Sequence, residues 1–330
     1  MKTILNRLIN YEQLSKEEAR EVLIKLSKGE FNASQMAAFI TVYMMRSISL
    51  EELEGFRDAL LELCIKVPLD DYQTIDLCGT GGDGKNTFNI STLAAFVTAG
   101  AGVLVSKHGN YGVSSISGSS NVIEALGIGF SNHIDFLKKC LDKAGICILH
   151  APLFHPAMKN VGPIRKDLGV KTFFNMLGPM VNPALPKNQL VGVFSLELAR
   201  MYGYLYQKGN QNFTILHAMD GYDEVSLTGP AKIISNTTEK IINPQDFGFS
   251  EIPATAIYGG ETVQEAAEIF MNILNGKGTQ AQTNVVCANA ALAIATAEQC
   301  SLEKAMEKAQ DSLFSKKALE ALQTLQKLSA

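Results

Sequence analysis

Four glycines occur within the six residues Gly79 to Gly84, directly after a short apolar segment, Thr74 to Cys78. Glycine lets the main chain approach a ligand closely, so that its N–H groups can point at an anion. A helical segment, Leu93 to Ala99, comes next. The order strand, glycine loop, helix predicts an anion-binding turn, although a flexible turn is the alternative for the loop taken alone.

Short apolar segments alternate with helical ones after Tyr72. The expected strands are Thr74 to Cys78, Val103 to Ser106, Ile146 to Leu149, Gln189 to Phe194, Phe213 to His217 and two within Lys232 to Ile242. The expected helices between them are Leu93 to Ala99, Asn121 to Leu126 and Leu196 to Tyr206. This alternation predicts an α/β domain with a mostly parallel central sheet. From Thr262 onward we expect helices, with one candidate strand near Asn284 to Cys287.

The chain before Tyr72 has a helical pattern throughout. Three capping boxes, each a polar residue followed three positions later by Glu or Gln, mark helix starts: Ser15 with Glu18, Asn32 with Gln35, and Ser49 with Glu52. Pro68 ends the pattern. We therefore expect a small helical domain over residues 1–67, with helices near 170–186 as a candidate addition to it, and an α/β domain over residues 72–330.

Composition excludes several classes of protein. The chain has 330 residues, 46% of them hydrophobic and 19% charged, with a formal net charge of −4 and no long basic run. This argues against a nucleic-acid surface. No apolar run reaches the ~18 residues of a membrane span, and the N-terminus lacks the apolar core of a signal peptide. The six cysteines are scattered without a CxxC pair, which favours a reducing cytoplasm.

The glycine loop nearly matches the P-loop of ATP-binding proteins. The match fails after Lys85, where Asn86 replaces the Ser or Thr that binds magnesium. The following residues are also poor helix starters, and Ser91 or Thr92 is a better N-cap. We therefore expect the loop to extend to Asn89, with the anion site at the helix start near Ser91, and an ATPase is the disfavoured alternative.

A second polar loop follows the next expected strand. It opens with Lys107, His108, Gly109 and Asn110 and continues with Ser114, Ser115, Ser117, Gly118 and Ser119. Lys107 adds a positive charge, and Ser119 can cap a helix while donating a hydrogen bond to a phosphate. Two such loops at neighbouring strand ends predict one crevice for a ligand rich in phosphate and hydroxyl groups.

Seven motifs, in this order along residues 76–230, resemble those of the anthranilate phosphoribosyltransferase family: GTGGD, NIST, KHGN, SGS, HPAMKNVGPIRKDLG, FNMLGPMVNP and GYDEVSLTGP. The resemblance implies the fold of the pyrimidine nucleoside phosphorylases, a homodimer and a step in tryptophan biosynthesis. It also implies transfer of a phosphoribosyl group from phosphoribosyl pyrophosphate to anthranilate with magnesium. A pyrimidine nucleoside phosphorylase-like enzyme is the alternative.

The resemblance also implies roles for individual residues. Around phosphoribosyl pyrophosphate it places Gly79, Gly82, Asp83, Thr87, Asn89, Ser91, Thr92, Lys107 and Ser119. Around magnesium, with two ions per subunit, it places Ser91, Asp223 and Glu224. Around anthranilate it places Gly79, His108, Asn110, His155 and Arg165. Two positions depart from the family pattern, since Tyr111 replaces the usual Arg and Asn121 replaces a common Asp.

The chemistry of such a reaction agrees with this set of residues. Displacing pyrophosphate from the ribose C1 leaves negative charge on the leaving group, which cations and backbone amides stabilise. The amine of anthranilate is neutral at pH 7 and needs no strong base, so we assign no catalytic residue, although His108 and His155 are candidate proton acceptors. Arg165 can pair with the anthranilate carboxylate, or it can be an exposed helix arginine.

Overall fold

The computed structural model describes residues 1–112 and 117–329. Two of the serines expected in the second loop, Ser114 and Ser115, lie outside the described residues. The chain divides into two compact units, each treated by itself. One unit combines Met1–Val67 with Ala151–Pro183, and the other combines Pro68–His150 with Ala184–Ala330.

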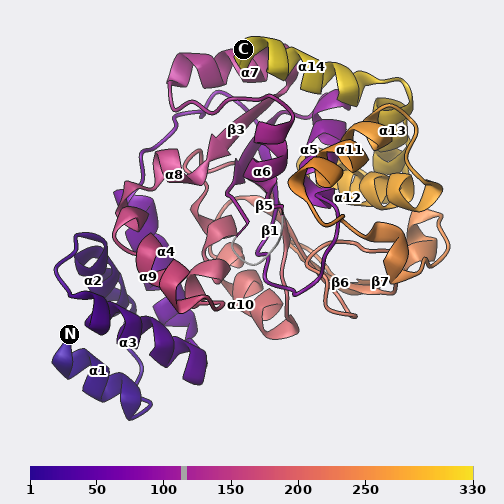
Figure 1. Cartoon of the computed structure of the whole chain (residues 1–330). Coiled ribbons are helices and arrows are strands. Elements are labelled where there is room, and N and C mark those ends of the chain that lie inside the picture. Colours follow the sequence, from indigo (N-terminus) through magenta and orange to yellow (C-terminus); the bar gives the residue numbers. More distant parts are fainter. Residues whose placement is uncertain (113–116, 330) are drawn as a thin grey trace. The chain divides into compact units, whose positions relative to one another are not determined.

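The first unit is helical (Figure 1). Its helices are α1 (Lys2–Ile9), α2 (Lys16–Ser27), α3 (Ala33–Met45), α4 (Leu50–Leu63), α8 (Ala151–Phe154) and α9 (Gly162–Leu168). Short 3-10 turns cover Pro156–Lys159, Phe173–Met176 and Gly178–Val181. All three expected capping boxes are formed, at the starts of α2, α3 and α4. Local sequence thus fixes where these three helices begin, because a side-chain oxygen satisfies an otherwise unpaired N–H in each.

Aromatic packing explains why residues 151–183 belong with the N-terminal helices. Phe173 stacks on Phe56 of α4 with ring centroids 4.7 Å apart, and it meets Tyr43 of α3 edge-on at 5.1 Å. Phe39 contacts the same cluster. Large buried rings dominate the packing of a small unit. We expected residues 72–330 to form the α/β domain and considered only residues from about 170 as an addition to the helical domain. In the structure, the whole segment 151–183 packs with the N-terminal helices instead.

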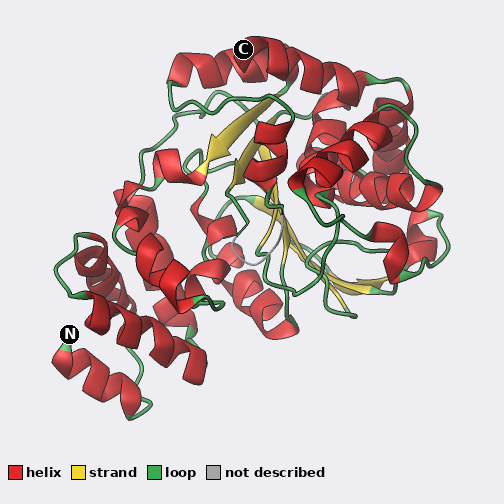
Figure 2. Ribbon diagram, viewed as in Figure 1, coloured by secondary structure: helices red, strands yellow, loops and turns green. Residues whose placement is uncertain are grey.

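The second unit contains the sheet whose strands are yellow in Figure 2. Within the described residues it has seven strands in the order β3-β2-β1-β4-β5-β6-β7. The strands are β1 (Ile75–Gly79), β2 (Val105–Gly109), β3 (Ile146–His150), β4 (Asn188–Gly192), β5 (Asn212–Ala218), β6 (Ala231–Ser235) and β7 (Glu239–Ile242). Strands β1 to β5 pair in parallel, and β6 and β7 add antiparallel pairs at one edge. The mostly parallel sheet expected from the sequence is confirmed.

Helices cover both faces of this sheet. The remaining ones are α5 (Ile90–Gly100), α6 (Ser119–Ala125), α7 (Ile134–Ala144), α10 (Leu196–Gln207), α11 (Val263–Leu274), α12 (Gln280–Glu298), α13 (Leu302–Phe314) and α14 (Lys317–Ser329). Successive residues of a strand point to opposite faces. In β5, Phe213 contacts Tyr206 of α10, whereas Thr214 bonds to Thr296 of α12 at 2.7 Å. Helices α10 and α12 therefore lie on opposite faces, and α5 packs beside α12 (Figure 1).

Two local expectations were wrong. The candidate strand at Asn284 to Cys287 lies inside the long helix α12, which a capping box between Thr279 and Gln282 opens. A short apolar run fits a buried helix as well as a strand, and only its surroundings decide. Helix α5 starts at Ile90 with Asn89 at the N-cap, whereas Ser91 or Thr92 was expected there, two or three residues later. The Asn89 side chain makes no capping bond.

Candidate functional site

The glycine loop joins the carboxyl end of β1 to the start of α5. Gly81, Gly82 and Gly84 all have positive φ, at 63°, 76° and 75°, a region that other residues enter at a cost. Between them, Asp83 accepts a hydrogen bond through Oδ1 from the Lys85 N–H at 3.0 Å. The glycines are therefore required by the backbone path, and the loop ends at Asn89 as expected.

The later half of this loop excludes a P-loop. Thr87 forms an isolated bridge with Tyr258, and the Asn86 amide donates to the Gly260 carbonyl at 3.0 Å. The Lys85 ammonium lies over the ring of Tyr222, 4.6 Å from its centroid. A P-loop would begin its helix at this lysine, whereas residues 86–89 are not helical and the helix begins at Ile90.

The second loop begins at the carboxyl end of β2, next to β1. Lys107 is only 2% exposed, and its ammonium donates to the Leu77 carbonyl of β1 at 2.6 Å. The His108 N–H donates to Asp76 Oδ1 at 3.1 Å. Ser119, the first residue of α6, donates through Oγ to the Asn110 carbonyl at 3.3 Å. Lys107 is thus a buried cation beneath the loops and His108 is buried beside it, whereas Asn110 is exposed.

A pair of hydrogen bonds joins the two loops. The Asn89 side-chain amide donates to the Ser117 carbonyl at 2.9 Å, and the Ser117 hydroxyl donates back to Asn89 Oδ1 at 3.4 Å. These bonds hold the glycine loop against the second loop at Asn89. Thr92 is also close in sequence to this junction, but it is buried in the first turn of α5.

Asp223 and Glu224 lie at the same edge of the sheet. Asp223 Oδ2 accepts from the Gly81 N–H at 2.7 Å, and Glu224 Oε1 accepts from the Ser91 N–H at 3.0 Å. A Cβ added to Gly79 would overlap the Asp223 carboxylate, and one added to Gly192 would overlap the Asp223 carbonyl oxygen. Glycine at these two strand ends lets the segment of Asp223 and Glu224, here called the acidic turn, lie directly against the sheet.

Burial and mutual repulsion disturb the titration of both carboxyl groups. Burial, together with the nearby carboxylate of Asp83, raises the pKa of Asp223 to about 7. Burial and the neighbouring Asp223 raise the pKa of Glu224 well above its usual range. Glu224 Oε2 is buried and has no hydrogen-bond partner among the described residues. The surroundings of both carboxyl groups thus disfavour their charged forms.

Two of the predicted residues belong to the helical unit. Arg165 of α9 stacks over Phe174 at 5.2 Å, and one nitrogen donates to Asn175 Oδ1 at 3.4 Å. Burial lowers the pKa of Arg165, and its Nε is buried without a partner in the described residues. His155 is buried, which lowers its pKa to about 4. Arg165 is therefore not the fully solvated arginine of the alternative interpretation.

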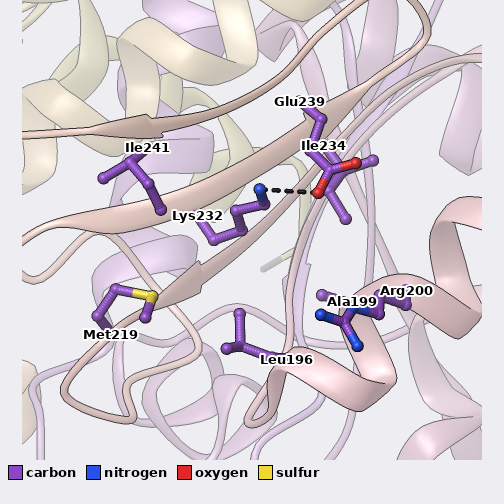
Figure 3. Close-up of a pocket in the computed structure, with 8 residues that line it drawn as sticks. All are labelled: Leu196, Ala199, Arg200, Met219, Lys232, Ile234, Glu239 and Ile241. Carbon is purple, nitrogen blue, oxygen red and sulfur yellow. Dashed lines mark ion pairs between the residues drawn. The ribbon is translucent and has the colours of Figure 1, made fainter.

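A separate cavity of about 160 Å³ lies beside β6 and β7, the two antiparallel strands at one end of the sheet (Figure 3). Its lining residues come from α10, the end of β5 and the two antiparallel strands: Leu196, Ala199, Arg200, Met219, Lys232, Ile234, Glu239 and Ile241. Lys232 and Glu239 form an ion pair at 2.7 Å across it. None of the residues predicted to bind a ligand lines this cavity.

Sequence reasoning missed one residue near the acidic turn. Asn289, in the middle of α12, is 2% exposed and hydrogen-bonds the main chain of Val225, next to Glu224. A signal was present, because Asn289 is the polar residue in the otherwise apolar stretch Val285–Ala293. A buried amide in an apolar helix requires partners and so points to a specific contact.

Asn121 has a clear local role that predicts the effect of a substitution. Its Oδ1 accepts from the N–H groups of Gly112 at 2.9 Å and Gly118 at 3.0 Å. A carboxylate accepts the same two bonds and favours a helix N-terminus. We expect Asn121→Asp to change kcat/KM by less than about tenfold, whereas Asn121→Leu, which removes the acceptor, should reduce it more. Steady-state kinetics tests this, and a loss beyond about a hundredfold in Asn121→Asp would reveal a specific need for the neutral amide.

Comparison with known proteins gives the same two kinds of domain, one helical and one α/β. Residues 2–64 match the model of the glycosyl transferase family, helical bundle domain, and residues 71–319 match the model of the glycosyl transferase family, a/b domain. The chain therefore has the two domains of a glycosyl transferase of this class. Among the described residues, no helix is both long and apolar enough to cross a membrane.

Individual relatives specify the family further. The chain is 70% identical over 329 residues to anthranilate phosphoribosyltransferase of Flavobacterium johnsoniae, covering 100% of both chains. It is 67% identical to that of Christiangramia forsetii, covering 100% of this chain and 99% of the relative. The chain belongs to the anthranilate phosphoribosyltransferase family.

Solved structures give the same result. The enzyme of Thermus thermophilus matches with a TM-score of 0.90 at 31% identity, covering 98% of each chain. The enzyme of Saccharomyces cerevisiae in complex with PRPP and Mg matches with a TM-score of 0.90 at 27% identity, covering 98% of this chain and 96% of that one. The family resemblance seen in the sequence motifs is confirmed.

Proposed function

We propose that this chain transfers the 5-phosphoribosyl group from phosphoribosyl pyrophosphate to anthranilate, in tryptophan biosynthesis. The products are N-(5-phosphoribosyl)anthranilate and pyrophosphate. The observation that carries the proposal is the meeting of two glycine- and serine-containing loops and the Asp223-Glu224 turn at one sheet edge. The names of relatives up to 70% identical support it. No observation favours the nucleoside phosphorylase alternative.

Phosphoribosyl pyrophosphate is proposed to bind along the two loops. The glycine loop from Gly79 to Asp83 and the hydroxyls of Ser91 and Ser119 are proposed to line its path, and Asn89 keeps the two loops together. The buried Lys107 ammonium, which donates a hydrogen bond to the Leu77 carbonyl of β1, is proposed to contribute positive charge near the carboxyl ends of β1 and β2. These groups stabilise the negative charge that develops on departing pyrophosphate.

Magnesium is proposed to bind at Asp223, Glu224 and the Ser91 hydroxyl. The unpartnered Glu224 Oε2 and the raised pKa of both carboxyl groups fit the binding of a cation at this position. In residues 1–112 and 117–329, no group of three or more His, Cys, Asp or Glu side chains has a metal-binding arrangement. Two carboxylates and a hydroxyl suit magnesium, which usually shares its coordination with substrate phosphates and water. When bound, the ion neutralises pyrophosphate charge; two ions per subunit are proposed.

Anthranilate is proposed to contact the residues that the family resemblance implies: Gly79, His108, Asn110, His155 and Arg165. The Arg165 guanidinium forms no ion pair within the described residues, and a carboxylate is its natural partner. With a pKa of about 4, His155 is neutral at pH 7 and a weak proton acceptor. It therefore suits the wall of a pocket better than general-base catalysis.

A homodimer and a cytoplasmic location complete the proposal. The family resemblance supports the dimer, and light scattering coupled to gel filtration measures it. All six cysteines are free thiols, which suits a reducing compartment.

The direct test mixes the protein with magnesium, phosphoribosyl pyrophosphate and anthranilate and follows the loss of anthranilate fluorescence. Loss that depends on all three components supports the proposal. Phosphorolysis of pyrimidine nucleosides without this activity would establish the alternative. Phosphate release from ATP, or no turnover of any of these substrates, would also overturn the proposal.

Arg165→Ala should raise the KM for anthranilate about tenfold to a hundredfold, because a charge-assisted hydrogen bond contributes roughly 1.5–3 kcal/mol. The KM for phosphoribosyl pyrophosphate should move much less, and Arg165→Lys should rescue only partly because it lacks the planar fork. Steady-state kinetics with each substrate varied in turn measures both constants. Lys166→Ala, an exposed neighbour on α9, is the matched control. An equal effect on both substrates would contradict a specific role in anthranilate binding.

A further inference from the structure

The side-chain amide of Asn289 pairs with both main-chain polar groups of Val225, the residue that follows Glu224. Its Oδ1 accepts from the Val225 N–H at 3.1 Å, and its Nδ2 donates to the Val225 carbonyl at 2.8 Å. The same Nδ2 also donates to the Val285 carbonyl, one turn earlier in α12, at 2.8 Å. One amide therefore ties residue 225 to a helix 64 positions away along the chain.

The pair lies in the interior, where hydrogen bonds are hard to replace. Asn289 and Val225 are each 2% exposed, so water cannot substitute for a lost partner. A buried donor or acceptor left unpaired costs the free energy of its desolvation. Loss of the Asn289 amide would leave both the N–H and the carbonyl of Val225 without this partner. The contact therefore holds the main chain at residue 225 more firmly than packing alone.

Val225 directly follows the two carboxylates proposed to bind magnesium. The turn is fixed on its other sides by the Gly81 and Ser91 N–H groups and by the close approach of Gly192. These contacts fix the two acidic side chains and the main chain of Asp223. Asn289 instead hydrogen-bonds the main chain of Val225, on the other side of Glu224. Releasing it would let the Glu224 carboxylate change position while the loops stay in place.

Resting on the proposed function, we infer that Asn289 is a positioning residue for the magnesium-binding carboxylates. It touches neither substrate nor metal and acts through the main chain of Val225. Partners that orient metal ligands typically change metal affinity about tenfold to a hundredfold when they are removed. A residue that merely stabilised α12 would instead lower the melting temperature and leave metal affinity unchanged.

The test measures equilibrium binding of phosphoribosyl pyrophosphate, without anthranilate, as magnesium is varied. Asn289→Ala should raise the half-saturating magnesium concentration about tenfold or more. Asn289→Ser is the second variant, because its hydroxyl can bond the Val285 carbonyl within the helix and keep α12 intact while Val225 stays unheld. It should show the same shift. In turnover assays at saturating magnesium, the KM for anthranilate should change less than about threefold.

Thr296→Val is the matched control. Thr296 is a buried polar residue of the same helix, bonded to Thr214 and to the Leu292 carbonyl, each at 2.7 Å, and these partners lie away from the acidic turn. The substitution should lower the melting temperature without shifting the magnesium dependence. If the Asn289 variants behave like Thr296→Val, the positioning role is wrong. If the wild-type protein binds no phosphoribosyl pyrophosphate with magnesium, the proposed function itself fails.

Discussion

Replacing Asp223 and Glu224 together with alanine should reduce turnover by about a thousandfold or more, the scale set by losing charge stabilisation at a leaving group. The structure gives the reason, because main-chain donors of the glycine loop and of the first turn of α5 align both carboxylates. Initial rates measured over a range of magnesium concentrations provide the test.

The same substitution should leave the fold intact and the melting temperature unchanged or higher. Burial raises the pKa of both carboxyl groups, so their charged forms destabilise the folded state at neutral pH. Glu298→Ala, which removes an exposed partner of Lys308, is the control for a lost carboxylate and should retain activity. Full activity of the double variant at limiting magnesium would refute the metal assignment.

Gly192→Ala should lower kcat/KM by about a hundredfold, roughly 2.7 kcal/mol, and also lower the melting temperature. The added methyl would overlap the carbonyl oxygen of Asp223. Gly192 cannot retreat, because it is paired with Gly79 of β1 on one side and Leu216 of β5 on the other. The acidic turn must therefore move, and the carboxylates move with it.

Kinetics and thermal unfolding of the same preparation measure both effects of Gly192→Ala. Gly229→Ala is the matched control, since a Cβ at Gly229 meets nothing within 4 Å. It should behave like the wild type. If Gly192→Ala keeps the kinetics and melting temperature of the wild type, the close contact between residue 192 and Asp223 does not position the carboxylates.

Local sequence determined much of the architecture. Three capping boxes located helix starts because their hydrogen bonds span only three residues. Alternating strands and helices predicted the parallel sheet, since period and length are local properties. The glycines at 81, 82 and 84 predicted the close-approach loop, and each adopts a positive φ. The motifs also identified the family, because their order and spacing are sequence properties themselves.

Tertiary structure alone decided the features that depend on distant partners. Residues 151–183 belong to the helical unit because Phe173 packs against Tyr43 of α3 and Phe56 of α4. Val285 and its neighbours form helix rather than strand because α12 is buried against α5 and the sheet. Asp223 meets a loop 142 residues earlier, and Asn289 secures the residue after Glu224. Such contacts are set by how the sheet and helices pack, and no short-range pattern encodes which buried amide will face which peptide group.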